Sequence, residues 1–304
     1  MKETPHIIVV AGPTASGKTR LGIELAQKYN GEIVSADSMQ IYRGMDIGTA
    51  KATPEEQRAV PHHMIDIIEP DEAYSAARYV EDAAACCDEI LSRGKVPVVV
   101  GGTGLYIDSL ISGRDFASDN DGDRSLRQEL EQQYDVLGGS AMLELLRSFD
   151  PERAARLHPS DRRRIVRAIE IYRLTGITAT AHDAATRALP KRYRADYLVL
   201  HCADRAVLYQ RINDRVDQMV RDGLFDEVES LLRRGINEAC TSMQAIGYKE
   251  VVQALAGTVS REDAIEQIKL GSRRYAKRQM TWFGRNPDAI SLEIGAVPPL
   301  LCFD

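Results

Sequence analysis

Residues 12–19 of the chain read GPTASGKT and match the pattern G-x-x-x-x-G-K-[ST]. The segment directly follows a short apolar run at residues 6–11 and directly precedes a helical pattern at residues 19–29. In this context glycines let consecutive backbone N–H groups turn inward around an anion, and the helix N-terminus adds its positive dipole end. The feature predicts a phosphate-binding loop inside an α/β domain, and it constrains the fold more than any other part of the sequence.

The residues expected to bind the anion are those of the loop itself. They are Gly12, Pro13, Thr14, Ala15, Ser16, Gly17, Lys18 and Thr19. Lys18 would supply a positive charge to the terminal phosphates, and Thr19 a hydroxyl for Mg²⁺, the one metal cofactor that we expect. Loops of this type occur in nucleotide- and ATP-binding proteins, and the loop does not reveal which diphosphate or triphosphate it holds.

Further short runs rich in β-branched residues occur at residues 32–36, 95–100 and 196–202. Helical patterns such as residues 73–93 lie between them. Alternation of strands and helices is typical of a parallel sheet, in which ligands bind at the carboxyl ends of the strands. We therefore predict an α/β fold with a P-loop-containing parallel sheet flanked by helices.

The pattern changes between residues 113 and 194, where helical segments punctuated by prolines contain no convincing strand. We expect this part to be a helical insertion domain that binds RNA. Residues 1–112 and 195–304 would then form the P-loop core, with helical spacing through residues 207–232 and 265–283.

The charge of the chain is unevenly distributed. Its 304 residues include 39 Lys and Arg against 45 Asp and Glu, a net charge of −6. Residues 153–215, however, hold 14 basic and 6 acidic residues, which gives +8. A second basic run, residues 273–285, contains no acid. A single such run is usually a solvated helix face, but two on an acidic chain favour contact with a polyanion.

Several sequence features concern location. The longest apolar run, residues 96–107, is broken by a proline and glycines and falls short of the roughly 18 residues that a membrane span needs. The N-terminus has no apolar signal segment, and the five cysteines form no C-x-x-C pair. We expect a cytoplasmic protein with reduced thiols and no membrane partner.

Asp37 follows the second predicted strand and would lie beside the phosphate loop. A carboxylate there can hold Mg²⁺ or accept a proton from a nucleophile. Gln40 suits base recognition or loop packing equally well. The adjacent His62 and His63 would point in different directions, and with no Cys or His cluster nearby they are weak candidates for a metal site.

Six segments in this order resemble one family. They are GPTASGKT, ADSMQIYRGMDIGTAK (36–51), PHHMID (61–66), GKVPVVVGGTGLYI (94–107), RIVRAIEIYRLTG (164–176) and YAKRQMTWF (275–283). Together they closely resemble the bacterial tRNA dimethylallyltransferases, also called tRNA isopentenyltransferases, over residues 6–286. The resemblance implies transfer of a dimethylallyl group from dimethylallyl diphosphate to N6 of the adenine 3′ of the anticodon, in tRNAs that read codons beginning with U.

The resemblance also implies catalytic roles. Asp37 would be the general base that takes a proton from the adenine amine. Lys18 and Arg215 would bind and stabilise the diphosphate leaving group.

Carried over position by position, the family's tRNA contacts fall on segments along the whole chain. They are Asp37, Ser38, Met39, Gln40, Thr103, Arg127, Asp161, Arg162, Arg163, Arg164, Ile165, Gly247, Lys277, Arg278 and Gln279. The target base must leave the stack of the anticodon stem-loop, and contacts of the basic runs to the RNA backbone would compensate that cost. Gly284 stands where the family usually has an arginine, so Arg285 receives no specific contact.

Three alternatives remain open at this stage. An adenylate isopentenyltransferase would use the same donor but act on free AMP, ADP or ATP. A P-loop small-molecule kinase or hydrolase would use Asp37 to bind Mg²⁺, and a non-enzymatic RNA-binding module would need no intact phosphate loop. No long heptad pattern appears in the sequence, so we expect a monomer.

Overall fold

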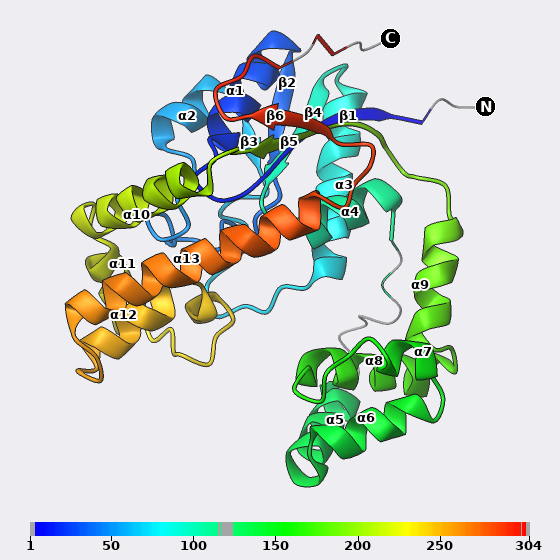
Figure 1. The fold of residues 1–304 in the computed structure, drawn as a ribbon. Helices are drawn as coiled ribbons and strands as arrows, with labels where there is room; N and C mark the ends of the chain where they lie inside the picture. Colours follow the sequence, from blue (N-terminus) through cyan, green and yellow to red (C-terminus); the bar gives the residue numbers. More distant parts are fainter. Residues whose placement is uncertain (1–3, 115, 117–123, 299, 302–304) are drawn as a thin grey trace. The chain divides into compact units, whose positions relative to one another are not determined.

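The computed structural model describes residues 4–114, 116, 124–298, 300 and 301. The chain forms two compact units, one comprising Met1–Ile111 with Arg192–Asp304 and the other Ser112–Lys191 (Figure 1). The first unit contains the sheet, and the second is helical in its described part.

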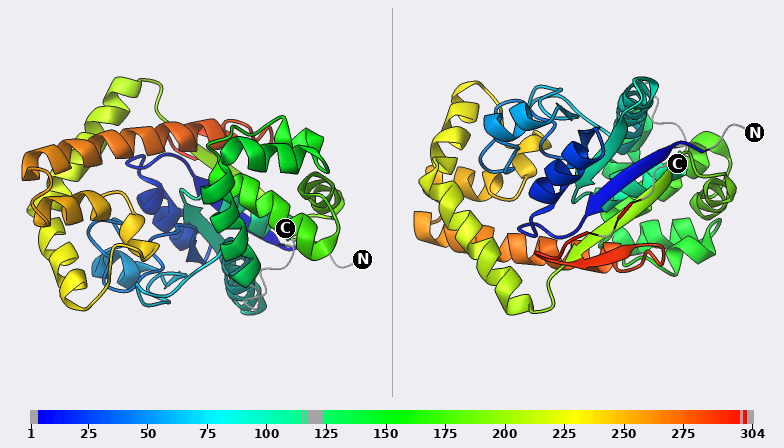
Figure 2. Two further views of the ribbon diagram at one scale, coloured as in Figure 1. Left: turned by 90° about the horizontal axis from the view of Figure 1, so that it is seen from below. Right: turned by 90° about the horizontal axis from the view of Figure 1, so that it is seen from above.

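The first unit is built on a six-stranded sheet with the order β3-β2-β4-β1-β5-β6. Its strands are β1 (His6–Ala11), β2 (Gly31–Ser35), β3 (His62–His63), β4 (Val96–Gly101), β5 (Arg194–His201) and β6 (Ile290–Glu293). Every pairing is parallel, and β1 lies between β4 and β5 (Figure 2). The predicted α/β fold with a parallel sheet is confirmed.

Helices flank this sheet and continue beyond it. They are α1 (Lys18–Lys28), α2 (Pro54–Ala59), α3 (Ala76–Ser92), α4 (Gly104–Ser112), α10 (Arg205–Arg221), α11 (Leu224–Arg233), α12 (Tyr248–Leu255) and α13 (Arg261–Phe283). Leu21 and Leu25 of α1 pack on Ile8 and Val10 of β1 because residues two apart in a strand share one face. A separate core joins α10 to α13 with the segment that follows β2.

The structure differs from the prediction at three places. Strands β3 and β6 were not predicted, and one stretch predicted as helical is divided into two helices. β3 has only two residues and β6 has four, and both lie at the edges of the sheet, so neither produces the long apolar run of a buried strand. The helical spacing through residues 207–232 is divided between α10 and α11 by Gly223, whose φ of 104° no continuous helix can accommodate.

The second unit consists of α5 (Arg124–Leu137), α6 (Gly139–Arg147), α7 (Pro151–Ala154), α8 (Arg162–Thr175) and α9 (Ala179–Ala188). Its core contains Leu130, Met142, Leu146 and Ile169. The described residues of this unit contain no strand. Across the described ranges of both units, no helix is long and apolar enough to cross a membrane.

Candidate active site

The 12–19 loop connects β1 to α1 and has the backbone that an anion-binding loop requires. Gly12 has a φ of 145°, and a Cβ there would lie 2.7 Å from the carbonyl oxygen of Leu200. Gly17, with a φ of 88°, precedes α1, and no side chain caps the N-terminus of that helix. The first N–H groups of α1 are therefore available to an anion.

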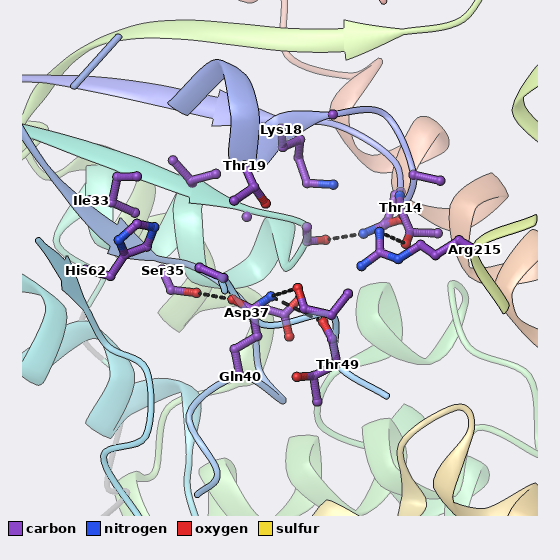
Figure 3. A pocket seen from close by; sticks show the side chains of 18 of the residues that line it. Thr14, Lys18, Thr19, Ile33, Ser35, Asp37, Gln40, Thr49, His62 and Arg215 are labelled. Atoms are coloured by element: carbon purple, nitrogen blue, oxygen red, sulfur yellow. Dashed lines mark hydrogen bonds between the residues drawn. The ribbon is translucent and has the colours of Figure 1, made fainter. Parts of the chain in front are cut away.

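The loop forms one wall of a cavity of about 140 Å³. Thr14, Lys18 and Thr19 line it from the loop, Asp37 and Gln40 from the segment after β2. Arg215 reaches it from α10. Figure 3 shows Lys18 and Arg215 pointing into the cavity, with Asp37 across from them. The arrangement places two cations and one carboxylate around a space large enough for a small anionic group.

The charge state of Lys18 depends on this surrounding. Burial, and to a lesser extent the charge of Arg215, lower the pKa of Lys18 to about 7, while Asp37 acts in the opposite direction. The Nζ of Lys18 donates a hydrogen bond to the carbonyl oxygen of Pro13 at 2.7 Å. An anion in the cavity would restore the full charge of Lys18, because an opposite charge favours the protonated amine.

Helix α10 fixes the loop from its outer side. Arg211 donates from Nε to the carbonyl oxygen of Ala15 at 3.0 Å, and Arg215 donates from Nη1 to Oγ1 of Thr14 at 3.3 Å. Burial lowers the pKa of Arg215 and Asp37 raises it. A guanidinium keeps its charge in proteins, so Arg215 presents a permanent cation to the cavity.

Gln279 of α13 joins the loop to the end of β4. Its Oε1 accepts the N–H of Thr14 at 2.8 Å, and its Nε2 donates to the carbonyl oxygen of Gly102 at 3.0 Å. Only 4% of Gln279 is exposed, and a Cβ at Gly102 would lie 2.1 Å from its Nε2. The tRNA contact expected at Gln279 stays a prediction, and the amide in this structure serves the frame of the cavity.

The Asp37 turn is held by its own backbone and by the segment after β4. Asp37 accepts the N–H of Met39 at 2.8 Å through Oδ1, and Ser38 donates its N–H to Oγ1 of Thr103 at 3.1 Å. Gln40 accepts from the hydroxyl of Ser35 at 3.0 Å and donates to the carbonyl oxygens of residues 49 and 50. The strip at residues 37–40 and Thr103, predicted from widely separated segments, therefore lies in one place.

A carboxylate from α11 organises the neighbouring turn. Glu227 accepts three backbone N–H groups, from Asp46 and Ile47 at 2.8 Å and from Gly48 at 3.1 Å. It also accepts the hydroxyl of Tyr248 at 2.6 Å. This turn leads into Thr49, so Glu227 sets the position of one wall of the site.

A second cavity, of about 260 Å³, meets the first one. Both are lined by a shared set of residues, which are Thr14, Asp37, Thr49, Arg215 and Tyr275. The second cavity is otherwise bordered by apolar side chains, among them Met39, Ile212, Val216, Met219 and Ile246. Arg278 lies on its lining as well. Asp37 thus stands between a cationic cavity and a largely apolar one.

The remaining predicted tRNA contacts of the first unit lie on α13 and before α12. Lys277 and Arg278 are exposed and form no ion pair with any residue that the structure describes. Gly247 is buried directly before α12, with a φ of 103°. The structure therefore brings Arg278 to the second cavity but leaves Gly247 with a role in the backbone turn.

The predicted contacts of the second unit are divided between surface and core. Arg163 and Arg164, in the first turn of α8, are exposed and make no ion pair within the described ranges. Arg162 pairs with Asp135 at 2.8 Å, and Asp161 precedes the helix as its N-cap.

The other two members of that set, Ile165 and the exposed Arg127, are both held by contacts within the unit. The side chain of Ile165 is fully buried, so it is not accessible to RNA. Arg127 pairs with the buried Glu170 at 2.9 Å.

The His62–His63 pair is an edge strand whose two rings diverge. His62 lines the first cavity and its Nδ1 lies 2.8 Å from the carbonyl oxygen of Val60, whereas His63 lies 2.7 Å from the Glu32 carboxylate. In the described part of the chain, no three or more His, Cys, Asp or Glu residues gather as a metal-binding group.

Gln279, Glu227 and Tyr275 belong to the site but were not expected to shape it. Each is brought in by packing of α10 to α13, and Gln279 meets Thr14 across 265 residues of sequence. No local pattern indicates such a contact, although the YAKRQMTWF segment marks the region that contains two of the three.

The sheet, the 12–19 loop and the facing carboxylate define an α/β protein with a cationic cavity beside a carboxylate. Comparison with known proteins places it further. The family model described as "IPP transferase" matches residues 40–286, and one described as "Isopentenyl transferase" matches residues 5–66. The chain belongs to the IPP transferase family.

Relatives and solved structures agree with this family. The chain is 48% identical over 279 residues to a tRNA dimethylallyltransferase of Thermoanaerobacter sp. (strain X514), covering 91% of this chain and 88% of the relative. A tRNA isopentenylpyrophosphate transferase structure from Bacillus halodurans shares 44% identity and a TM-score of 0.70, over 96% of this chain and 90% of that chain. A eukaryotic dimethylallyltransferase acting on tRNA gives a TM-score of 0.81 at 31% identity, over 95% and 74% of the two chains.

Proposed function

We propose that the protein transfers the dimethylallyl group of dimethylallyl diphosphate to N6 of the adenine directly 3′ of the anticodon, in tRNAs that read codons beginning with U, and releases diphosphate. The names of the relatives support a prenyl transfer to tRNA. The observation that carries the proposal is the position of Asp37, which lines both the cationic cavity and the apolar one.

In this proposal the first cavity holds the diphosphate of the donor in place of a nucleotide such as ATP. The free N–H groups at the start of α1, Lys18 and Arg215 all present positive charge to it. These groups are fixed by the loop, α10 and Gln279 before the reaction begins. Charge that develops on the departing diphosphate is stabilised most by donors that need no rearrangement.

Mg²⁺ fits the donors of this cavity. The hydroxyl of Thr19 and the carboxylate of Asp37 both line it, and hydroxyl and carboxylate oxygens are ligands that Mg²⁺ prefers. We assign Thr19 as the protein ligand, with the remaining oxygens coming from diphosphate and water. When bound, the ion would neutralise part of the diphosphate charge.

The second cavity would take the adenine and the prenyl carbons that it attacks. The bond between the allylic carbon and the diphosphate oxygen breaks, and a bond forms between that carbon and N6. One N6 proton passes to Asp37, and the electron pair of the broken bond leaves with the diphosphate. Because Oδ1 of Asp37 accepts the N–H of Met39, the carboxylate is oriented and its other oxygen is available for the proton.

The exposed cations of α13 and of the first turn of α8 would contact the backbone of the anticodon stem-loop. Arg163, Arg164, Lys277 and Arg278 form no ion pair with described residues, so each can release counterions from RNA. We further propose that the protein acts in the cytoplasm as a monomer, since its substrate is a cytoplasmic RNA.

The test is incubation of the full chain with Mg²⁺ and radiolabelled dimethylallyl diphosphate, with unmodified tRNA in one reaction and AMP in another. We expect label in the tRNA alone, and none when the adenine 3′ of the anticodon is replaced by guanine. Label in AMP would identify a nucleotide prenyltransferase instead. If neither tRNA nor AMP is labelled and the protein hydrolyses ATP, it is a P-loop kinase or hydrolase instead.

A further inference from the structure

The only tryptophan of the chain, Trp282, lies near the end of α13 in an unusual setting. Its ring lies against Gly104, where a Cβ would meet its Cδ1 at 2.2 Å. Its Nε1 donates to Oδ2 of Asp108 at 2.7 Å. Although this contact and the packing fix the ring on one side, 39% of the residue is exposed. The structure thus presents a large, immobilised aromatic surface to solvent.

Exposed basic residues flank this ring in sequence, and the carboxylate bound to its Nε1 is that of Asp108. Lys277 and Arg278 near the end of α13, and Arg285 just after it, are exposed and form no ion pair with any described residue, although Arg278 lies over the Tyr275 ring. The run from residue 273 to 285 contains no acid. An exposed aromatic ring beside exposed cations matches the composition of single-stranded nucleic-acid sites, where cations follow the backbone and rings stack on bases. An apolar protein partner would not need this charge.

The ring is also close to the second cavity along the helix. Arg278 lines that cavity, and Trp282 follows it by one turn, about 6 Å along the helix axis. Under the proposed function, the target adenine leaves the anticodon-loop stack to enter this cavity. The base next to the target adenine in the anticodon loop then loses a stacking partner, and this base lies near the mouth of the cavity.

We propose that Trp282 stacks on an unpaired base next to the target adenine and replaces the partner that the base has lost. This inference rests on the proposed function and adds a substrate-positioning residue to it. Stacking tolerates any base because every base has a π face. Trp282 therefore contributes to binding of the flipped-out conformation without selecting sequence.

A purely structural Trp282, covering Gly104 and Asp108, would not sense bases, and this difference provides the test. Since the chain contains one tryptophan, its intrinsic fluorescence reports on Trp282 alone. We would titrate the full-length protein with an unmodified anticodon hairpin. The control hairpin would have the same phosphates but abasic sites on both sides of the target adenine. We expect strong quenching with the first hairpin and little with the second, measured at saturation of each.

Variants give an independent measure. Trp282→Ala is expected to weaken hairpin binding about tenfold, and Trp282→Phe, which keeps a ring, less than about threefold. The KM for the hairpin would rise in Trp282→Ala, while kcat and the KM for dimethylallyl diphosphate stay near those of the wild type. An unchanged donor KM also shows that the variant is folded.

Equal quenching by both hairpins, or wild-type affinity in Trp282→Ala, would overturn the stacking role. If the hairpin is prenylated normally but leaves the emission unchanged, only this inference fails. If the hairpin is neither bound nor prenylated, the proposed function itself fails.

Discussion

The two cavities that meet at Asp37 are built from different materials. The first is bordered by Lys18, Arg215 and the backbone of the 12–19 loop, and hydrogen bonds from α10 and α13 hold that loop in place. The second is bordered largely by apolar side chains such as Val216 and Met219, whose positions depend on packing. A site for a diphosphate needs charges that are held in place. Burying cations without an anion costs free energy, so other contacts of the protein must hold them in position. A site for a planar base and a prenyl chain needs only shape and the exclusion of water.

The largest effect is expected at Asp37, where the two cavities join. Asp37→Asn should slow transfer by about 10²–10⁴-fold, the usual contribution of a general base, and leave substrate binding nearly unchanged. The measurement is a single-turnover rate with both substrates at saturation. The asparagine oxygen can still accept the N–H of Met39, so the turn is preserved. Asp214→Asn, an exposed change on α10, is the matched control, and a near-normal rate in Asp37→Asn would reject the base.

The second effect tests the cationic cavity through pH. Because the pKa of Lys18 is lowered to about 7, the free protein loses this charge as the pH rises above 7. A bound anion raises that pKa, so binding takes up a proton above pH 7. The Kd for inorganic pyrophosphate should be weakly pH-dependent below pH 7 and rise by up to about tenfold per pH unit above it.

The measurement is calorimetry in buffers of different ionisation enthalpy, which also counts the protons taken up. Lys18→Arg keeps its charge at these pH values and should remove the additional rise. If the Kd of Lys18→Arg rises above pH 7 as much as that of the wild type, the pH dependence comes from pyrophosphate itself and not from Lys18.

The third effect concerns the wall of the apolar cavity. Glu227→Gln replaces one acceptor oxygen by a donor that faces backbone N–H groups, so part of the turn at residues 46–48 loses its partner. We expect a loss of about 1–3 kcal/mol in the free energy of unfolding, measured by urea denaturation. Glu229→Gln, in the exposed pair with Arg233, should cost less than about 1 kcal/mol. Equal losses in both variants would contradict the anchoring role.

The smallest effect is expected at the exposed cations in the first turn of α8, which line neither cavity. Removing Arg163 and Arg164 together by change to glutamine should lower the slope of log K for tRNA against log salt concentration by about 1.5, since each contact contributes roughly 0.7–0.9. Fluorescence anisotropy at several KCl concentrations measures the slope. Arg162→Gln, whose native side chain already pairs with Asp135, should change it less. A slope that does not respond to the double change would remove α8 from the RNA surface.

The sequence is most informative where a structure depends on neighbours in the chain. The loop at residues 12–19 and the buried strands next to it follow from local patterns, and the structure contains both. The helical character of the insertion follows from a local pattern as well, and its described part forms helices α5 to α9. β3 and β6 escape prediction because an edge strand of two or four residues needs no apolar run. Glu227 was not predicted, and Gln279 was predicted only as a tRNA contact, so the supporting roles of both were missed for another reason. Their roles exist only after α11 and α13 pack against distant turns, and a glutamine or glutamate on a helix is ordinarily a solvated residue.

The position of β1 in the sheet has a consequence for how the chain acquires its native state. β1 pairs with β4 on one side and with β5 on the other, and the whole helical insertion lies between those two partners in sequence. During synthesis, the edge of β1 that pairs with β5 therefore stays unpaired until residues 194–201 have left the ribosome. Contacts of such sequence separation slow folding, and an unpaired apolar edge is prone to aggregation. A helical unit that folds on its own during this interval would shorten the effective distance that β5 must cover to reach β1.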